Sequence, residues 1–499
     1  MTGGTVNKDE VTLSQLGLRA RDGRDPAISG LSIDSRTVRP GHLFAALPGS
    51  AVHGGEFIQY ALRMQAAAVL TDRKGAEIAS EVLSGWEGAV VVAEDPRAAL
   101  AGAASLWYRD QPDHVVAVTG TSGKTSVASF TRQIWQALGH KAISMGTMGV
   151  EGDYHAKLAH TTPDPLTLHR LLAEATAAGV THTAMEASSH GLDQRRLDGV
   201  RVEAGAFTNF SQDHLDYHAG FDEYFAAKAL LFNHILQDGA SAVINVDSPR
   251  GRQMADIAKD RGLALTTVGQ NENAMLRILG QRYDATGQDL RFSVMGQTHL
   301  VRLGLIGGFQ AENVLAAMAL CLATGDSAES ILRVLPTLST VRGRMQLAAQ
   351  RENGAAVFVD YAHKPGAVVA ALQSLRPHVM GRIVCVIGAG GDRDRGKRPL
   401  MGEAAREHAD VVIVTDDNPR TEDPAAIRAA VLEGAGPDAT EVADRAEAIL
   451  RGVDALLPGD ALLICGKGHE TGQIVGQDVY PFDDAEQASV AVAALDGRI

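Results

Sequence analysis

The last third of the chain alternates short apolar runs with amphipathic stretches. Four apolar runs each end in a polar turn that contains glycine or proline, and they begin at Val357, Ile383, Val411 and Leu462. Apolar residues recur at helical spacing between the runs, over residues 366–376, 399–407 and 424–433. This alternation predicts a doubly wound, mostly parallel sheet, whose ligand site lies at the carboxyl ends of the strands. The polar turns all fall at those ends.

The N-terminal part shows a similar alternation on a smaller scale. Strands are expected over residues 28–33, 43–47, 67–70 and 89–92, and helices over residues 56–65 and 97–107. The natural interpretation is an α/β domain. The polar segments Asp34–Arg36 and Pro48–Ser50 follow two of the apolar runs, and residue chemistry alone favours turns over binding sites for both.

A glycine-rich turn lies between an expected strand and an expected helix in the middle of the chain. Val115–Val118 is an apolar run, and helical spacing begins again at Val127. The turn consists of Gly120, Thr121, Ser122, Gly123, Lys124 and Thr125. Such a turn aims backbone N–H groups at a phosphate, while its lysine reaches the β and γ phosphates and its threonine holds Mg²⁺. The loop is shorter than the usual pattern, because Val118 stands where the first glycine is expected.

Length and composition set the class of protein. The 499 residues divide into an N-terminal domain (1–111), a central phosphate-loop domain (112–340) and a C-terminal Rossmann-like domain (341–499). The formal net charge of −14 argues against nucleic acid or an anionic membrane as the main partner. The cysteines lack metal-ligand spacing, no apolar run approaches about 18 residues, and the N-terminus lacks a signal-peptide core. We therefore expect a cytoplasmic protein.

Two segments of the central domain offer ligands for a metal ion. Glu186 ends an apolar run, and an acidic residue at a strand end commonly holds Mg²⁺ in nucleoside-triphosphate enzymes. His214 and His218 are four residues apart, which would suit zinc on a helix, but no third ligand is evident. A role for His214 at a nucleotide–magnesium site fits its surroundings better.

Lys228 lies in an expected helix over residues 221–232 and has aromatic and aliphatic neighbours at three- and four-residue offsets. A lysine amine held in apolar surroundings can be neutral, and a neutral amine can add carbon dioxide to form a carbamate. Residue chemistry alone favours the other interpretation, a lysine whose amine reaches the solvent.

Residues later in the chain could also contact a nucleotide. Asn313 opens an alanine-rich helix and could contact a base, and Arg344 could contact a phosphate. Gly388-Ala-Gly390 hints at a dinucleotide fingerprint, but Arg393 occupies the position of its third glycine, so NAD is disfavoured.

Together these motifs resemble those of the Mur ligases, the amide-forming enzymes of peptidoglycan synthesis. The resemblance covers all three domains, and includes Asp34–Arg36, Gly120–Thr125, His160–Asp164, Met185–Gln194, Thr208–His218, the Lys228 helix, Asp360–His363, Gly391–Lys397, Asp417–Arg420 and Gly466–Glu470. It is greatest for the members that add the third peptide residue to UDP-N-acetylmuramoyl-L-alanyl-D-glutamate. It implies a UDP-binding N-terminal domain, a central ATP-binding domain, two Mg²⁺ sites and a monomer that takes only small-molecule substrates.

The resemblance also implies roles for individual residues. Lys124, Lys228, His214 and Asp360 match catalytic positions, and Thr125, Glu186, His214 and carbamylated Lys228 match the magnesium sites. Asn313 and Arg344 match the ATP site, together with the phosphate loop. The positions that match the UDP-linked substrate site are Ile33, Ser35, Ser50, His160, Thr161, Thr162, Ser188, Gln194 and Arg196. Ser122 and His160 replace asparagines that are common in the family.

The amino-acid substrate follows from the Asp417-Asn418-Pro419-Arg420 motif, which family members that use meso-diaminopimelate carry. A guanidinium matches the second carboxylate of diaminopimelate in a bidentate pair. The matching site residues are Arg393, Asp417, Asn418, Pro419, Arg420, Gly466 and Glu470. Two alternatives stay open from the residues alone: a folylpolyglutamate-type ligase and a nucleotide-switched binding protein without catalysis.

Overall fold

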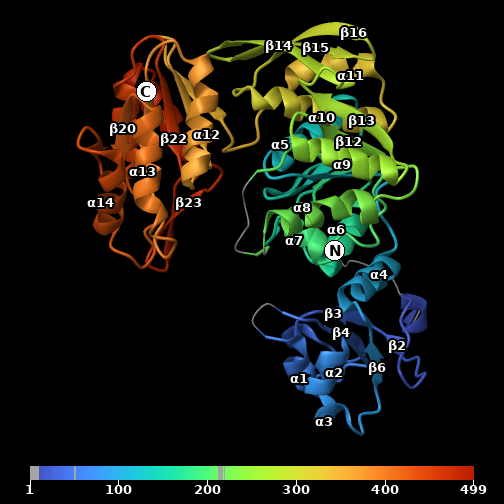
Figure 1. Ribbon diagram of the computed structural model, residues 1–499. Helices are drawn as coiled ribbons and strands as arrows, with labels where there is room; N and C mark the ends of the chain where they lie inside the picture. Colours follow the sequence, from blue (N-terminus) through green and yellow to red (C-terminus); the bar gives the residue numbers. More distant parts are fainter. Residues whose placement is uncertain (1–10, 50–51, 212–216, 219) are drawn as a thin grey trace. The chain divides into compact units, whose positions relative to one another are not determined.

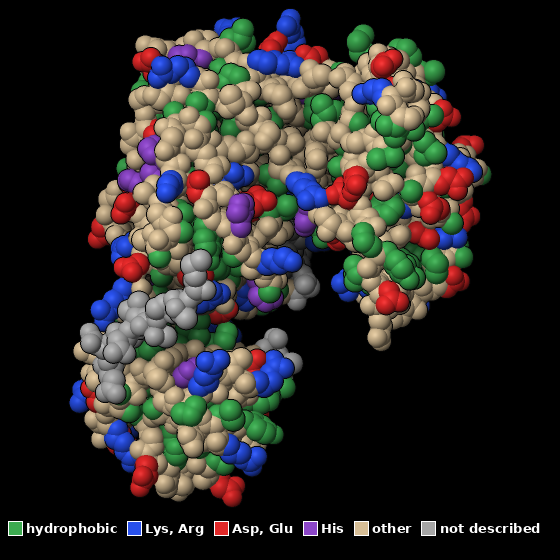
Figure 2. Space-filling model, turned by 180° about the vertical axis from the view of Figure 1, so that it is seen from behind, with side chains coloured by type: hydrophobic (Ala, Val, Ile, Leu, Met, Phe, Trp, Pro, Cys, Tyr) green, Lys and Arg blue, Asp and Glu red, His purple; other side chains and the backbone are tan. Residues whose placement is uncertain are grey.

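A computed structural model describes residues 11–49, 52–211, 217–218 and 220–499. Figure 1 shows its helices and strands. The chain separates into two compact units, one formed by Met1–Val268 with Ala316–Ala328, the other by Gly269–Leu315 with Glu329–Ile499. Within the described residues, no helix is both long enough and apolar enough to cross a bilayer. Acidic and basic side chains are interspersed on the face shown in Figure 2.

The first unit begins with a small parallel sheet. Its strands, in spatial order, are β3 (Gly30–Ser32), β4 (His42–Ala46), β5 (Ala68–Thr71) and β6 (Ala89–Val92). Alternate residues of β4 enter two separate cores, Leu43 and Ala45 one of them and Phe44 and Ala46 the other. Both faces of this sheet are therefore covered, as a parallel sheet requires.

Short helices and a two-stranded ladder surround this sheet. The ladder pairs β1 (Val11–Thr12) with β2 (Ala27–Ile28). The helices are η1 (Ser14–Leu16), η2 (Ser35–Thr37), η3 (Gly54–Phe57), α1 (Ile58–Arg63), α2 (Arg73–Ile78), α3 (Ser80–Leu83) and α4 (Pro96–Tyr108). The strand expected over residues 28–33 is wrong as a single element, because it is divided between β2 and β3 and ends before Ile33.

The larger sheet of the first unit carries the phosphate loop. Its strands, in spatial order, are β13 (Ala264–Gly269), β12 (Ser241–Asn245), β11 (Ala204–Phe207), β7 (His114–Thr119), β10 (His182–Glu186), β8 (Ala142–Gly146) and β9 (Gly149–Gly152). Only β9 among these runs antiparallel to its neighbour. The helices of this part are α5 (Lys124–Ala137), α6 (Pro165–Ala177), α7 (Ser189–Asp193), α8 (Phe221–Leu230), a π-helical turn (Leu231–Ile235) and α9 (Pro249–Asp260).

Three histidines stack at the amino-terminal end of this sheet. His114 and His182 are register partners on β7 and β10, and their ring centroids are 4.5 Å apart. His140 stacks at 4.2 Å on His182. The outer rings contact carboxylates, His114 that of Glu203 and His140 that of Asp326. Burial and the two flanking imidazoles lower the pKa of His182 to about 4.

The second unit contains an antiparallel meander and a six-stranded sheet. The meander consists of β14 (Leu276–Asp284), β15 (Gly287–Val294) and β16 (Gln297–Leu303). It is followed by α10 (Phe309–Ala323), α11 (Ala328–Val334) and η5 (Leu335–Thr337). The strands of the sheet, in spatial order, are β17 (Gln346–Gln350), β18 (Ala356–Asp360), β22 (Ala461–Cys465), β19 (Ile383–Ile387), β20 (Val411–Val414) and β21 (Thr440–Glu441).

The predicted doubly wound C-terminal sheet is confirmed, and every strand after β17 is parallel to its neighbour. The strands β19 and β22 are buried along their whole length between two hydrophobic cores. The covering helices are α12 (Pro365–Leu375), η6 (Arg376–His378), α13 (Lys397–His408), α14 (Pro424–Ala435), α15 (Arg445–Asp454) and α16 (Asp484–Leu495). A hairpin of β23 (Gly472–Val475) and β24 (Asp478–Pro481) follows β22. The polar turns after β18, β19, β20 and β22 consequently meet at one edge.

Candidate functional site

The phosphate loop joins β7 to α5 as its sequence predicts. Gly123 precedes the helix with a φ of 87°, and Gly120 has a φ of 144°. A Cβ atom at Gly120 would lie 2.0 Å from Oγ1 of Thr208, so a side chain cannot be accommodated there. The loop is held from the end of β11, because Ser122 N donates to Oδ1 of Asn209 at 2.9 Å.

Lys124 lies against its own loop. Its Nζ donates to the carbonyl oxygens of Gly120 and Thr121, both at 2.9 Å. The amine thus lies against the loop at the N-terminus of α5, an arrangement that suits a polyphosphate.

Thr125 and Glu186 form a cluster of oxygen ligands beside the loop. Oγ1 of Thr125 donates to Oε1 of Glu186 at 3.0 Å, and Thr147 N donates to the same oxygen at 2.8 Å. Gly146 makes room for this carboxylate, because a Cβ there would lie 2.1 Å from Oε1. One carboxylate and one hydroxyl beside a phosphate site fit the preference of Mg²⁺ for oxygen ligands. His214, the other expected ligand, lies outside the described residues.

Lys228 is buried, with an exposed fraction of 1%. Its Nζ donates to the Gly120 carbonyl at 2.8 Å and lies 4.2 Å from the ring centroid of Tyr224. The interpretation favoured by residue chemistry alone, a lysine that reaches the solvent, is wrong. Helix α8 instead directs this amine into the phosphate loop, 108 residues away in sequence.

The residues expected to hold the peptide part of the UDP-linked substrate lie together. Oγ of Ser188 donates to Oγ1 of Thr162 at 3.1 Å. Arg196 donates to the Thr162 carbonyl at 2.6 Å and to Oε1 of Gln194 at 2.8 Å. Thr161 contacts Oγ1 of Thr147 at 3.1 Å.

The other residues expected to bind that substrate lie in turns or are exposed. His160 is exposed. Ser35 begins the turn η2, which Asp34 caps by accepting from Arg36 N, and Ile33 is 40% exposed. Ser50 lies outside the described residues. Hydrogen bonds thus connect the residues of the Thr162 cluster to one another.

Asn313, Arg344 and Asp360 occupy the second unit. Asn313 is buried on α10 and donates to Oε1 of Gln310 at 3.0 Å. The Asp360 carboxylate accepts from Met345 N at 2.8 Å and from Ala362 N at 2.9 Å. Burial raises the pKa of Asp360 despite these bonds.

A cavity of about 500 Å³ opens at the carboxyl edge of the six-stranded sheet. It brings together six of the seven residues expected to bind the amino acid, namely Arg393, Asp417, Asn418, Arg420, Gly466 and Glu470. Pro419 does not line it; its carbonyl oxygen instead lies against Gly391. The charged residues that line the cavity are Lys364, Arg393, Lys397 and Arg420 together with Asp394, Asp417 and Glu470, so it offers partners for both the carboxylates and the ammonium groups of an amino acid.

Arg420 and Glu470 are oriented by contacts within this edge. Arg420 has a φ of 50°, and its guanidinium donates to the Gly391 carbonyl at 2.8 Å. Oε2 of Glu470 accepts from Nδ2 of Asn418 at 2.8 Å. Arg393 is exposed at the rim.

Three family models match successive parts of the chain: the Mur ligase family catalytic domain over residues 27–108, the Mur ligase middle domain over 118–321, and the Mur ligase glutamate ligase domain over 343–468. The chain is 48% identical to the UDP-N-acetylmuramoyl-L-alanyl-D-glutamate--2,6-diaminopimelate ligase of Bradyrhizobium diazoefficiens, over 94% of this chain and 95% of that protein. The chain belongs to the Mur ligase family.

A second relative and a solved structure carry the same name. A protein of the same name from Caulobacter vibrioides is 48% identical over 95% of this chain and 97% of its own. A solved structure of a protein with that name has a TM-score of 0.72 at 33% identity, and the match covers 94% of this chain and 95% of that chain.

Two polar residues of this Mur ligase escape sequence reasoning. Lys467 is fully buried beside Asn418, and Nζ of Lys397, which lines the cavity, donates to the His363 carbonyl at 2.9 Å. Burial lowers the pKa of both lysines. Both lysines lie inside glycine-containing motifs on which the family resemblance rests. A charged residue within such a turn is the feature of the sequence that could have indicated them.

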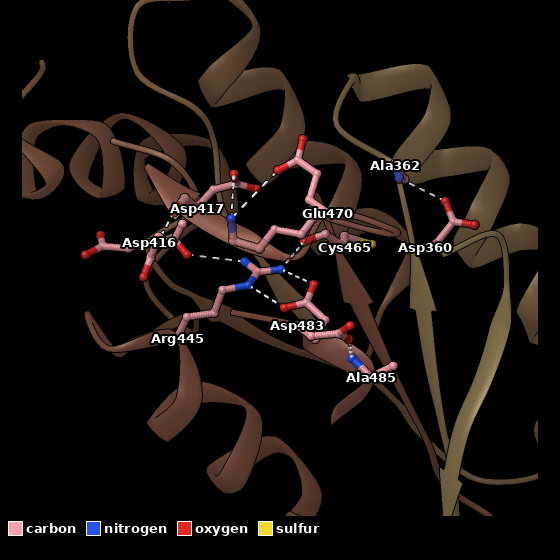
Figure 3. Close-up of polar contacts among 12 residues, drawn as sticks. Asp360, Ala362, Asp416, Asp417, Arg445, Cys465, Glu470, Asp483 and Ala485 are labelled. Carbon is pink, nitrogen blue, oxygen red and sulfur yellow. Dashed lines mark hydrogen bonds and ion pairs between the residues drawn. The ribbon is translucent and has the colours of Figure 1, made fainter. Parts of the chain in front are cut away.

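The buried ion pair between Arg445 and Asp484 also escapes sequence reasoning. The guanidinium makes two bonds of 2.7 Å to this carboxylate, and both side chains are 0% exposed. It also donates to the carbonyls of Asp416, at 3.2 Å, and Cys465, at 3.0 Å, as Figure 3 shows. One side chain thereby joins the turn that follows β20 to the last residue of β22.

Proposed function

We propose that this Mur ligase adds meso-diaminopimelate to UDP-N-acetylmuramoyl-L-alanyl-D-glutamate with hydrolysis of ATP to ADP and phosphate, in the cytoplasmic synthesis of peptidoglycan precursors. The names of its relatives support this reaction. The observation that carries the choice of amino acid is the cavity lined by Arg393, Arg420 and Glu470. Lysine lacks the second carboxylate and would leave these guanidinium groups without the bidentate partner that diaminopimelate offers.

The reaction would proceed in two steps. The γ-phosphoryl group moves from ATP to the γ-carboxylate of D-glutamate, which gives an acyl phosphate and ADP. The amine of diaminopimelate then attacks the acyl carbon, and the tetrahedral intermediate expels phosphate as the amide forms. Lys124 would bind the β and γ phosphates during the transfer. Asn313 and Arg344 would bind the nucleotide, and Asp360 would act beside it.

Thr125 and Glu186 would hold one Mg²⁺, with His214 as a further ligand. When bound, the metal neutralises charge on the phosphates. We propose that Lys228 carries a carbamate that serves a second Mg²⁺. Ile33, Ser35, Ser50 and the cluster around Thr162 and Ser188 would bind the UDP-linked substrate, and we propose that the enzyme works as a monomer.

The deciding experiment measures phosphate release from ATP with the UDP-linked substrate and either meso-diaminopimelate, L-lysine or no amino acid. Turnover only with diaminopimelate is expected. Turnover with lysine would refute the role of Arg420, and no turnover in any mixture would refute the ligase.

The carbamate has a test of its own. Lys228→Ala should lose activity and regain part of it when a small carboxylic acid replaces the carbamate. Lys124→Ala is the matched control, because an added acid cannot replace its amine. Full activity of Lys228→Ala without any acid would refute the carbamate.

A further inference from the structure

Lys467 is a charged side chain with no exposed surface, located between two glycines directly after β22. Its ammonium group is satisfied within the protein. Nζ donates to Oδ1 of Asn418 and to the Gly472 carbonyl, both at 2.8 Å. Two carboxylates lie just beyond hydrogen-bond distance, Oδ1 of Asp417 at 4.0 Å and Oε2 of Glu470 at 3.8 Å. Such burial is costly, so each of these contacts has to compensate for lost hydration.

Lys467 fixes which way the Asn418 amide points. Oδ1 of Asn418 accepts from the ammonium and also from Ile474 N at 2.9 Å. An ammonium and a backbone N–H only donate, so the amide oxygen has to face them. The amide nitrogen is then left to donate to Oε2 of Glu470 at 2.8 Å. The reversed amide would set donor against donor on one side and acceptor against acceptor on the other.

The residues of this network differ in whether they can contact a ligand. Asn418, Asp417 and Glu470 line the cavity, whereas Lys467 does not. The ammonium group of Lys467 offsets part of the negative charge of Asp417 and Glu470.

We propose that Lys467 is a positioning residue for amino-acid recognition. It acts through Asn418 to hold the Glu470 carboxylate toward the ammonium group of an amino-acid substrate. This inference rests on the proposed function and adds a residue that does not itself contact the substrate.

The test compares kinetic constants of the full chain in phosphate release. Lys467→Met removes the charged amine and keeps an unbranched side chain that is one atom shorter. We expect KM for meso-diaminopimelate to rise about tenfold or more, kcat to fall less than about threefold, and KM for ATP and for the UDP-linked substrate to stay within about twofold. A side chain that only supported folding would lower activity without this selective change in KM.

A double-mutant cycle with Glu470→Gln tests the route. If Lys467 acts through Glu470, adding Lys467→Met to Glu470→Gln should raise KM less than about threefold further. The proposal would be overturned if KM of the double mutant were about tenfold higher than that of Glu470→Gln. It would also be overturned if Lys467→Met left KM unchanged. If Lys467→Met does not fold, Asn418→Asp carries the test. That variant turns a carboxylate toward Glu470 and should raise the same KM about tenfold, and an unchanged KM would again overturn the inference.

Different results would overturn the proposed function and the role of Lys467. Absence of diaminopimelate-dependent turnover in the wild-type chain would overturn the proposed function, and this inference with it. Normal wild-type turnover with unaltered variants would overturn the inference alone.

Discussion

Replacing Asp484 by asparagine should strongly destabilise the C-terminal part of this Mur ligase. The substitution keeps the shape of the side chain but removes the charge that compensates Arg445, and neither side chain is exposed. The Asp484 carboxylate now accepts two bonds of 2.7 Å from that guanidinium. Breaking a buried pair from one side costs about 3–5 kcal/mol, because the other charge stays buried without its partner. At about 2–4 °C per kcal/mol, the unfolding temperature should fall by about 6–20 °C.

Differential scanning calorimetry of the full chain would measure this loss, and hydrogen exchange would locate it. Faster exchange is expected in residues 416–420 and 466–470, because Arg445 holds the carbonyls of Asp416 and Cys465. The matched control is Glu447→Gln on α15, the helix that carries Arg445. Its ion pair with Arg451 is exposed, at 56% for the arginine and 49% for the glutamate, and should contribute less than about 1 kcal/mol.

A loss of stability in Asp484→Asn no larger than that in Glu447→Gln would contradict a stabilising role of the buried pair. The double variant Arg445→Met with Asp484→Leu gives a second criterion. It should be more stable than Asp484→Asn, since it leaves no buried charge without a partner.

Three further predictions concern the histidine stack, the magnesium site and the amino-acid site. Burial holds the pKa of His182 near 4 in the folded chain, below the ordinary 6.5, so the unfolded chain binds more protons between these values and stability falls as the pH drops through this window, by about 3 kcal/mol. His182→Phe should lose this component, and parallel plots of unfolding free energy against pH for both proteins would contradict the assignment. Gly146→Ala places a Cβ 2.1 Å from Oε1 of Glu186 and should raise the Mg²⁺ concentration for half-maximal activity by about tenfold, measured by metal titration; an unchanged titration would count against Glu186 as a ligand. Arg420→Lys should raise KM for meso-diaminopimelate by about 10–100-fold, because a lysine cannot form the bidentate pair, and should leave KM for the UDP-linked substrate unchanged. An equal rise in both constants would argue for a general defect.

Features that repeat locally could be predicted from the sequence. The apolar runs that form β18, β19, β20 and β22 differ from the intervening helices in period and length, so the parallel sheet follows from the pattern of apolar residues alone. The topology of such a sheet then gathers the ends of its strands, which is why Arg393, Arg420 and Glu470 share one cavity although they follow different strands.

The contacts that sequence reasoning misses join residues far apart in the chain. Lys228 donates to Gly120 across 108 residues, and Arg445 pairs with Asp484 across 39. Neither pair produces a local pattern, because a periodicity describes one element and not the partner packed against it. Residue chemistry alone assigns Lys228 to solvent for this reason, although its helix is correctly expected. The π-helical turn at Leu231–Ile235, directly after α8, likewise has no signal in composition.

The boundary between buried strands and polar turns has a consequence for how such an enzyme can change. The strands β19 and β22 are buried at every position, whereas Arg420 and Glu470 stand outside them in the connecting segments. Substitutions that alter the preferred amino acid therefore need not disturb the packing that keeps the sheet folded. Substitutions at Arg420 or Glu470, whose side chains are only partly buried, should therefore change the preferred amino acid while the chain keeps its thermal tolerance.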